Sequence, residues 1–127
     1  MSEPLEDLAA VTDAVFRHRL SGLQALTAQE AMLRQQLARL DEARLAGIAE
    51  ASGDIGMRAL GADLLWQGWV MRQRTQLNMR LANVLVMKEA QGRALRAAFG
   101  KARVAEELCA QQKAVAKADR EKRLNRD

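Results

Sequence analysis

The sequence predicts an all-α protein that folds as a single domain over residues 1–127, a long antiparallel two-helix coiled-coil hairpin. Three observations favour this fold. Aromatic residues make up only 3% of the chain and proline occurs once, while Ala, Leu, Arg, Gln and Glu recur throughout, which is the composition of long helices. A single cluster of turn-forming residues interrupts the chain. The two halves on either side of this cluster carry opposite net charge.

Helix one is expected over residues 4–50. Ser2, Pro4 and the acidic residues around them mark its beginning, because proline is tolerated in the first turn and carboxylates complement the positive end of a helix. The leucines of this helix follow heptad spacing and form an apolar seam that comprises Leu23, Leu26, Leu33, Leu37 and Leu40.

A turn is expected over residues 51–56. This stretch holds SGDIG from Ser52 to Gly56, and glycine can adopt the backbone angles that turns require and other residues avoid. Either Ser52 or Asp54 is suited to cap the following helix, because a short polar side chain accepts a hydrogen bond from a free N–H at a helix start. No proline and no comparable cluster occurs over residues 57–123, so helix two is expected over this whole range.

Helix two carries its own seam, with alternating steps of four and three residues. The seam begins with large aliphatic side chains and weakens toward small and polar ones, in the order Leu77, Leu81, Val84, Lys88, Gln91, Leu95, Ala98, Ala102, Ala105 and Cys109. Small residues let two helices approach closely but bury little apolar area. We therefore expect modest stability toward the C-terminal end.

The charges favour pairing of the two halves with each other. Residues 1–63 hold six Arg against ten Asp and Glu for a net charge of −4, whereas residues 64–127 hold fourteen Lys and Arg against six acids for a net charge of +8. Opposite charges beside a seam favour this pairing over like-with-like pairing, and the short turn makes it antiparallel. We therefore expect a monomer in isolation. Because helix two is the longer, Lys113–Asp127 should project beyond helix one as a basic overhang.

The sequence offers little for catalysis, metal binding or a cofactor. His18 is the one histidine and is expected to be a solvated helix residue, while Cys109 is the one cysteine and is expected to be a small apolar seam residue. The adjacent carboxylates at positions 41–42 and 106–107 diverge by about 100° on a helix, so neither pair converges on one reacting atom. We expect a protein that is not an enzyme and has no cofactor.

The same features bear on location and on nucleic acid. No stretch approaches the roughly 20 apolar residues that a membrane-spanning helix needs, and the acidic start MSEPLEDL lacks an apolar signal core, so a cytoplasmic protein is expected. A net charge of +4 and a pI of about 9.8 favour nonspecific attraction to phosphates. Since much of the positive charge faces an acidic helix one, nucleic acid is not the expected partner.

The two tryptophans, Trp66 and Trp69, lie three residues apart and just ahead of a basic run. On an α-helix their side chains are separated by about 60°. Three interpretations are open. Both rings could cover the end of the hairpin against Ile48 and Ile55, or at least one ring could be exposed as an anchor for a partner protein, because Trp and Arg dominate binding hot spots. The third interpretation is a foot on anionic lipid.

Two stretches have a familiar layout. The stretch from Trp66 to Arg103, WQGWVMRQRTQLNMRLANVLVMKEAQGRALRAAFGKAR, begins with an aromatic-rich helix start and continues through Gln-, Arg- and Leu-containing turns to turns rich in Lys and Arg. The residues from Gln112 to Leu124 form a charged tail. In these stretches, and in its size and charge order, the whole chain resembles the FliJ family of flagellar export proteins and their YscO-type counterparts in virulence type III secretion.

The resemblance implies a non-enzymatic stalk of a flagellar or type III protein export apparatus, held at the cytoplasmic face of the inner membrane only through its partners. The end with both termini would bind the ring of the hexameric export ATPase, and a patch on the early second helix would bind the cytoplasmic domain of an export gate protein. Export chaperones are further implied partners. The ATPase-binding end would comprise Leu5, Leu8, Arg120, Lys122 and Arg123. The gate-binding patch would comprise Trp66, Trp69, Gln73, Gln76 and Arg80.

From Trp69 onward, the members of the gate-binding patch fall at i, i+4, i+7 and i+11 and share one helix face. A second hypothesis comes from another class of protein, a generic coiled-coil scaffold or chaperone-like adaptor that dimerises through its apolar stripe. A third hypothesis, an anionic-polymer binder, predicts an affinity for DNA that falls steeply with salt.

Overall fold

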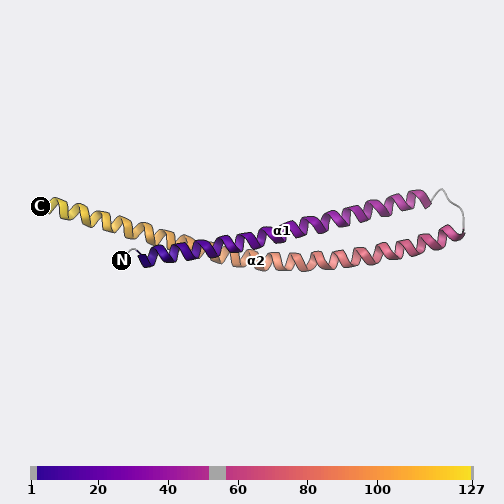
Figure 1. Cartoon of the computed structure of the whole chain (residues 1–127), viewed down its shortest axis with the longest axis horizontal. Helices are drawn as coiled ribbons and strands as arrows, with labels where there is room; N and C mark the ends of the chain where they lie inside the picture. The colour runs from indigo at the N-terminus through magenta and orange to yellow at the C-terminus, as the bar shows by residue number, and fades with distance from the viewer. Residues whose placement is uncertain (1–2, 52–56, 127) are drawn as a thin grey trace. The chain divides into compact units, whose positions relative to one another are not determined.

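The computed structural model describes residues 3–51 and 57–126, all of which are helical. Helix α1 spans Glu3–Ala51 and helix α2 spans Met57–Arg126 (Figure 1). No strand occurs among these residues, which confirms the prediction of an all-α protein. The range of α1 agrees with the prediction to within one residue at each end, and α2 continues three residues beyond the predicted end. The predicted turn from Ser52 to Gly56 lies outside the described residues.

The chain divides into two compact units, to both of which α1 and α2 contribute. The middle unit comprises Ala25–Lys88, and the terminal unit comprises Met1–Gln24 together with Glu89–Asp127. In the terminal unit, α2 continues past the beginning of α1 (Figure 1). Every α2 side chain from Lys113 to Arg126 is exposed, as expected for the predicted overhang.

In the middle unit the two helices pair in antiparallel orientation. Glu30 of α1 contacts Lys88 of α2, whereas Asp41, further along α1, lies 3.9 Å from Arg74, which is earlier in α2. The partner's position in α2 therefore falls as the position in α1 rises. This pairing confirms the predicted helical hairpin.

The seam of α2 was predicted correctly from its spacing. All ten predicted positions from Leu77 to Cys109 are buried or half-buried, and the five predicted leucines of α1 are half-buried as well. Among the described residues only four side chains are buried: Val70, Val84, Ala98 and Ala105. These four are spaced by multiples of seven, so they lie on one side of α2. Two of them are alanines, which bury little apolar area.

An aromatic contact joins the helices of the terminal unit. The rings of Phe16 in α1 and Phe99 in α2 lie 5.5 Å apart at an interplanar angle of 53°. This tilted geometry is favourable for aromatic pairs. The guanidinium of Arg103 lies 5.9 Å from the Phe99 ring centroid and adds a cation–π contact. Further along α1, a Cβ atom on Gly22 would lie 3.9 Å from Gln91, which comes before Phe99 in α2. The two helices are therefore antiparallel in the terminal unit too.

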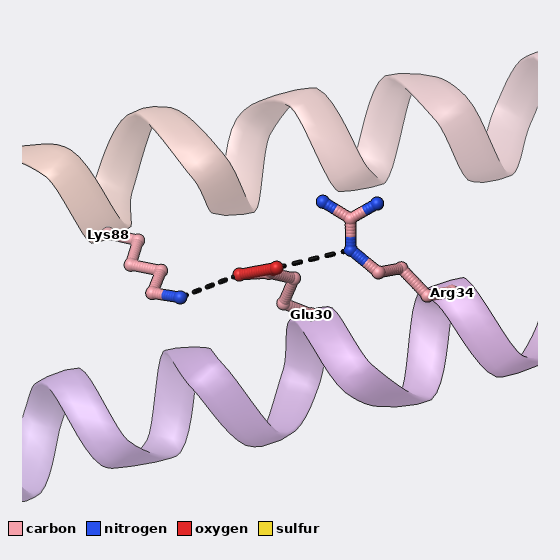
Figure 2. Close-up of polar contacts among 3 residues, drawn as sticks. All are labelled: Glu30, Arg34 and Lys88. Carbon is pink, nitrogen blue, oxygen red and sulfur yellow. Dashed lines mark hydrogen bonds and ion pairs between the residues drawn. The ribbon is translucent and has the colours of Figure 1, made fainter.

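A charged cluster interrupts the seam in the middle unit (Figure 2). The Glu30 carboxylate accepts a hydrogen bond of 2.8 Å from Nζ of Lys88 and one of 3.1 Å from Nε of Arg34. The Glu30 side chain is only 16% exposed. These two hydrogen bonds, that from Lys88 above all, hold the pKa of Glu30 below its usual value of 4.5. A polar pair at a seam position favours one helix register over others, since any shift would leave its charges unpaired.

Candidate protein-binding surface

The side chain of Trp66 on α2 packs against Gly47 of α1, which has no side chain. A Cβ atom built on Gly47 would stand 2.6 Å from both Cη2 and Cζ3 of the Trp66 indole. The ring therefore rests against the α1 backbone, and only glycine leaves room for it. Trp66 is half-buried in this position. Trp66 is therefore a packing residue of the middle unit. The first interpretation required such packing of both tryptophans.

Trp69 takes the other role. Its side chain is 47% exposed, and one residue later Val70 is 1% exposed. The interpretation in which both rings are buried is therefore wrong for Trp69, and Ile48, one of its expected neighbours, is itself exposed. Ile55, the other expected neighbour, lies outside the described residues. One ring packs and one ring faces solvent, as the interpretation with an exposed anchor allowed.

The remaining members of the gate-binding patch are also divided by burial. Gln76 and Arg80 are exposed, while Gln73 is half-buried. Gln73 is three residues after Val70 and seven after Trp66, which places it on the seam side of α2. The exposed part of the patch is thus narrower than predicted and comprises Trp69, Gln76 and Arg80.

A groove extends this exposed patch along the boundary between the two helices of the middle unit. It has a volume of about 380 Å³, and Arg80 is one of its lining residues. We call it the flank groove, and its lining comprises Gln29, Met32, Leu33 and Gln36 of α1 with Arg80, Asn83, Val84 and Met87 of α2. On α2 the surface runs from Trp69 to Met87 in steps of seven, four, three and four residues, which keeps it on one helix face.

The two methionines of the flank groove are open to solvent. Met32 is 61% exposed and Met87 is 47% exposed. Methionine is flexible and polarizable, so such side chains adapt to an apolar partner surface. The sequence pattern did not predict this groove. The spacing of Met87 from Arg80 by seven residues was visible in the sequence, but Met32 could be placed beside it only once the pairing of α1 with α2 was known.

The predicted ATPase-binding end is not brought together as one surface. Leu5 is half-buried, and Leu8 lines a hollow of the terminal unit with Val104 and Ala105. The three predicted cations, Arg120, Lys122 and Arg123, are exposed and come after Gln112, the last α2 residue that is partly covered. The leucines and the cations therefore belong to different parts of the terminal unit.

The described residues contain no group of three or more His, Cys, Asp or Glu side chains that could hold a metal ion. Among the same residues, no helix has both the length and the apolar character needed to cross a membrane. Cys109 is half-buried at its predicted seam position, and His18 is exposed. Comparisons with protein-family models, curated proteins and solved structures find no match to the chain.

Proposed function

We propose that this chain is a non-enzymatic coupling component of a flagellar or type III protein export apparatus, which engages the export ATPase ring and the cytoplasmic domain of an export gate protein. The proposal rests on the resemblance of the sequence to the FliJ and YscO-type proteins. The antiparallel pairing of α1 and α2 supports it, because the resemblance implies a two-helix hairpin.

The observation that carries the gate contact is the exposure of Trp69 on the same face of α2 as Arg80 and the flank groove. A half-exposed indole, a guanidinium and two open methionines along one side of the middle unit include side chains that are common in protein-binding hot spots. The groove offers an apolar floor at Leu33 and Val84 for a side chain of the partner. In this proposal Trp69 is the anchor, and Trp66 supports the anchor by fixing α2 against α1.

The ATPase contact is assigned to the overhang from Lys113 to Arg126. This segment holds six Lys and Arg against two acids, and every side chain in it is exposed. A helix of this kind offers cations to an acidic lining without first having to leave another helix. In this proposal Arg120, Lys122 and Arg123 supply the cations, while Leu5 is half-buried and Leu8 is 46% exposed in another part of the terminal unit.

Co-purification tests this proposal. The chain should be retained at micromolar concentration by the export ATPase and by the gate cytoplasmic domain of the same organism. Replacing Trp69 with Ala should weaken gate binding by about 2 kcal/mol, which is roughly thirtyfold, while the melting temperature changes little. Leu45→Ala is a matched control, because Leu45 is an exposed apolar residue of α1 in the same unit, at 59% exposure.

Two results would contradict the proposal. If neither partner retains the wild-type chain, the coupling function is wrong. If Trp69→Ala lowers the melting temperature strongly and leaves gate binding intact, Trp69 is a packing residue and the anchor is wrong.

A further inference from the structure

A second apolar surface lies on α2, on the side turned away from α1. Leu64, Met71, Met79 and Val86 have nearly equal exposures of 67%, 65%, 63% and 68%. They are separated by seven, eight and seven residues, which places them on one face of the helix. The opposite side of α2 faces α1, and Val70 is buried there.

Small uncharged residues fill the positions between these four. Gly68, Thr75 and Ala82 stand three or four residues from their larger neighbours, so all seven share the face. We call this surface the outer stripe; it comprises Leu64, Gly68, Met71, Thr75, Met79, Ala82 and Val86. The alternation of large and small side chains along one helix face is the pattern by which a helix receives the side chains of a second helix.

Over residues 64–88, which contain the outer stripe, every charged residue of α2 is Lys or Arg. No Asp or Glu occurs in α2 between Asp63 and Glu89. Arg72 lies about 60° from the centre of the stripe on one side and Arg74 about 100° from it on the other, as measured by residue spacing on an ideal helix. A Cβ atom on Gly68, a stripe position, would lie 3.4 Å from the Arg72 guanidinium. Within the described residues Arg72 forms no ion pair. Arg74 forms a long ion pair of 3.9 Å with Asp41, and the side chains of Arg74 and Asp41 are both about half exposed.

We propose that the outer stripe docks an amphipathic α-helix of a partner protein, whose apolar face is flanked by Asp and Glu. The apolar spacing calls for a helix. Arg72, which forms no ion pair with the residues that the structure describes, and the weakly paired Arg74 call for acidic flanks. A second copy of the chain docked through the same stripe would bring two positively charged surfaces together, which is unfavourable. A lipid surface fits less well, because the stripe is narrow and contains no aromatic residue.

This docking site is separate from the one that contains Trp69. Trp69 lies roughly 120° around α2 from the centre of the outer stripe, as measured by residue spacing on an ideal helix. The two surfaces can therefore be tested independently on the same protein.

Peptide binding tests the proposal. The probe is a synthetic helical peptide with Leu and Ala on one face and Glu on both flanks, and its control carries Lys in place of Glu. We expect the full chain to bind the Glu peptide at micromolar concentration and at least about tenfold more tightly than the Lys peptide. Met79→Glu should weaken binding of the Glu peptide at least about tenfold, and Arg72→Glu should reverse the preference between the peptides.

Two matched variants isolate the surface. Val11→Glu introduces the same charge at a residue of α1 that is 59% exposed, and should leave peptide binding unchanged. Trp69→Ala should leave it unchanged as well. Circular dichroism checks that each variant keeps its helix content, which we expect because every substituted side chain is exposed.

Four results would overturn the proposal. The first is no binding of the Glu peptide, and the second is equal binding of both peptides. The third is a wild-type dimer that Met79→Glu dissociates, since a second copy would then occupy the stripe. The fourth is binding to vesicles of phosphatidylcholine and phosphatidylserine that Met79→Glu abolishes, with no binding of the Glu peptide, since the surface would then be a lipid site.

Discussion

Gly47 and Trp66 show how a missing side chain determines the position of a large one. The indole rests where a methyl group on Gly47 would stand, so the glycine cannot be judged by its helix propensity alone. This contact also separates the roles of the two tryptophans. With Trp66 held against α1, Trp69 three residues later is turned toward solvent.

Replacing Gly47 with Ala should therefore destabilise the middle unit. Alanine gains about 1 kcal/mol of helix propensity, but the forced shift of the Trp66 ring should cost about 1 to 3 kcal/mol and outweigh it. The emission of Trp66, measured in a Trp69→Phe background, should shift to the red as the ring becomes solvated. Gly92→Ala is the control: its Cβ would meet no atom within 4 Å, so the substitution should raise stability by about 1 kcal/mol. A Gly47→Ala protein that melts higher, with unchanged emission, would refute the close contact.

The cluster at Glu30 makes stability depend on pH. Hydrogen bonds from Lys88 and Arg34 lower the pKa of Glu30 in the folded protein. A carboxyl group with a lowered folded pKa stabilises the fold at pH values above its unfolded pKa, and this contribution is lost as the pH falls through the folded pKa. The loss should therefore take place below pH 4.5, the usual value for Glu.

Glu30→Gln tests this dependence, because glutamine does not titrate. The variant should be less stable than the wild type at neutral pH, and the difference should shrink as the pH is lowered below 4.5. Urea unfolding followed by circular dichroism at several pH values measures both. A difference that stays constant with pH would mean that the carboxylate charge does not contribute.

At the level of the helices, heptad spacing explains where α2 packs. Its buried positions change from Val70 and Val84 in the middle unit to Ala98 and Ala105 in the terminal unit. Alanine buries less apolar area than valine, so each turn of the terminal unit contributes less to stability. The pair of Phe16 and Phe99 compensates in part, at about 0.5 to 1.5 kcal/mol beyond its buried area.

The overhang is expected to be dispensable for the fold. A chain that ends at Gln112 loses 14 of the 70 residues of α2 but no partly covered side chain. Its helical signal in circular dichroism should fall, while the midpoint of thermal unfolding should change by no more than a few degrees, in line with roughly 0.5 kcal/mol or less from exposed residues. Under the proposed function the same truncation should abolish ATPase binding. A chain that ends at Ala97 is the contrast, because it also loses the buried Ala98 and Ala105 and should unfold at a clearly lower temperature.

For the whole molecule, we expect a monomer, because the apolar seams of α1 and α2 pack against each other within one chain. The predicted seam residues of both helices are covered within the two units, so they are not available to a second copy unless the hairpin opens. Static light scattering at micromolar concentration should give a mass near 14.1 kDa. A mass twice as large that persists on dilution would favour the scaffold hypothesis over the coupling function.

The sequence alone was sufficient to predict the helices, the hairpin and the seam. Each depends on properties that repeat along one chain: helix-forming composition, the 3.6-residue period and the charge of each half. The ten seam positions of α2 follow from that period, and so does the common face of Trp69, Gln76 and Arg80. The predicted seam of α2 contains Lys88. Its partner Glu30 lies seven residues from both Leu23 and Leu37 and thus also at a seam position, although it is not a leucine.

The contacts across the hairpin were decided only by the tertiary structure. Sliding α1 along α2 by one heptad leaves the apolar seam in place, so the pattern of leucines does not specify which residues meet. The register is what pairs Glu30 with Lys88, sets Gly47 under Trp66, and brings Met32 beside Met87 in the flank groove. It depends on the fit of individual side chains far apart in the sequence, which no local period contains.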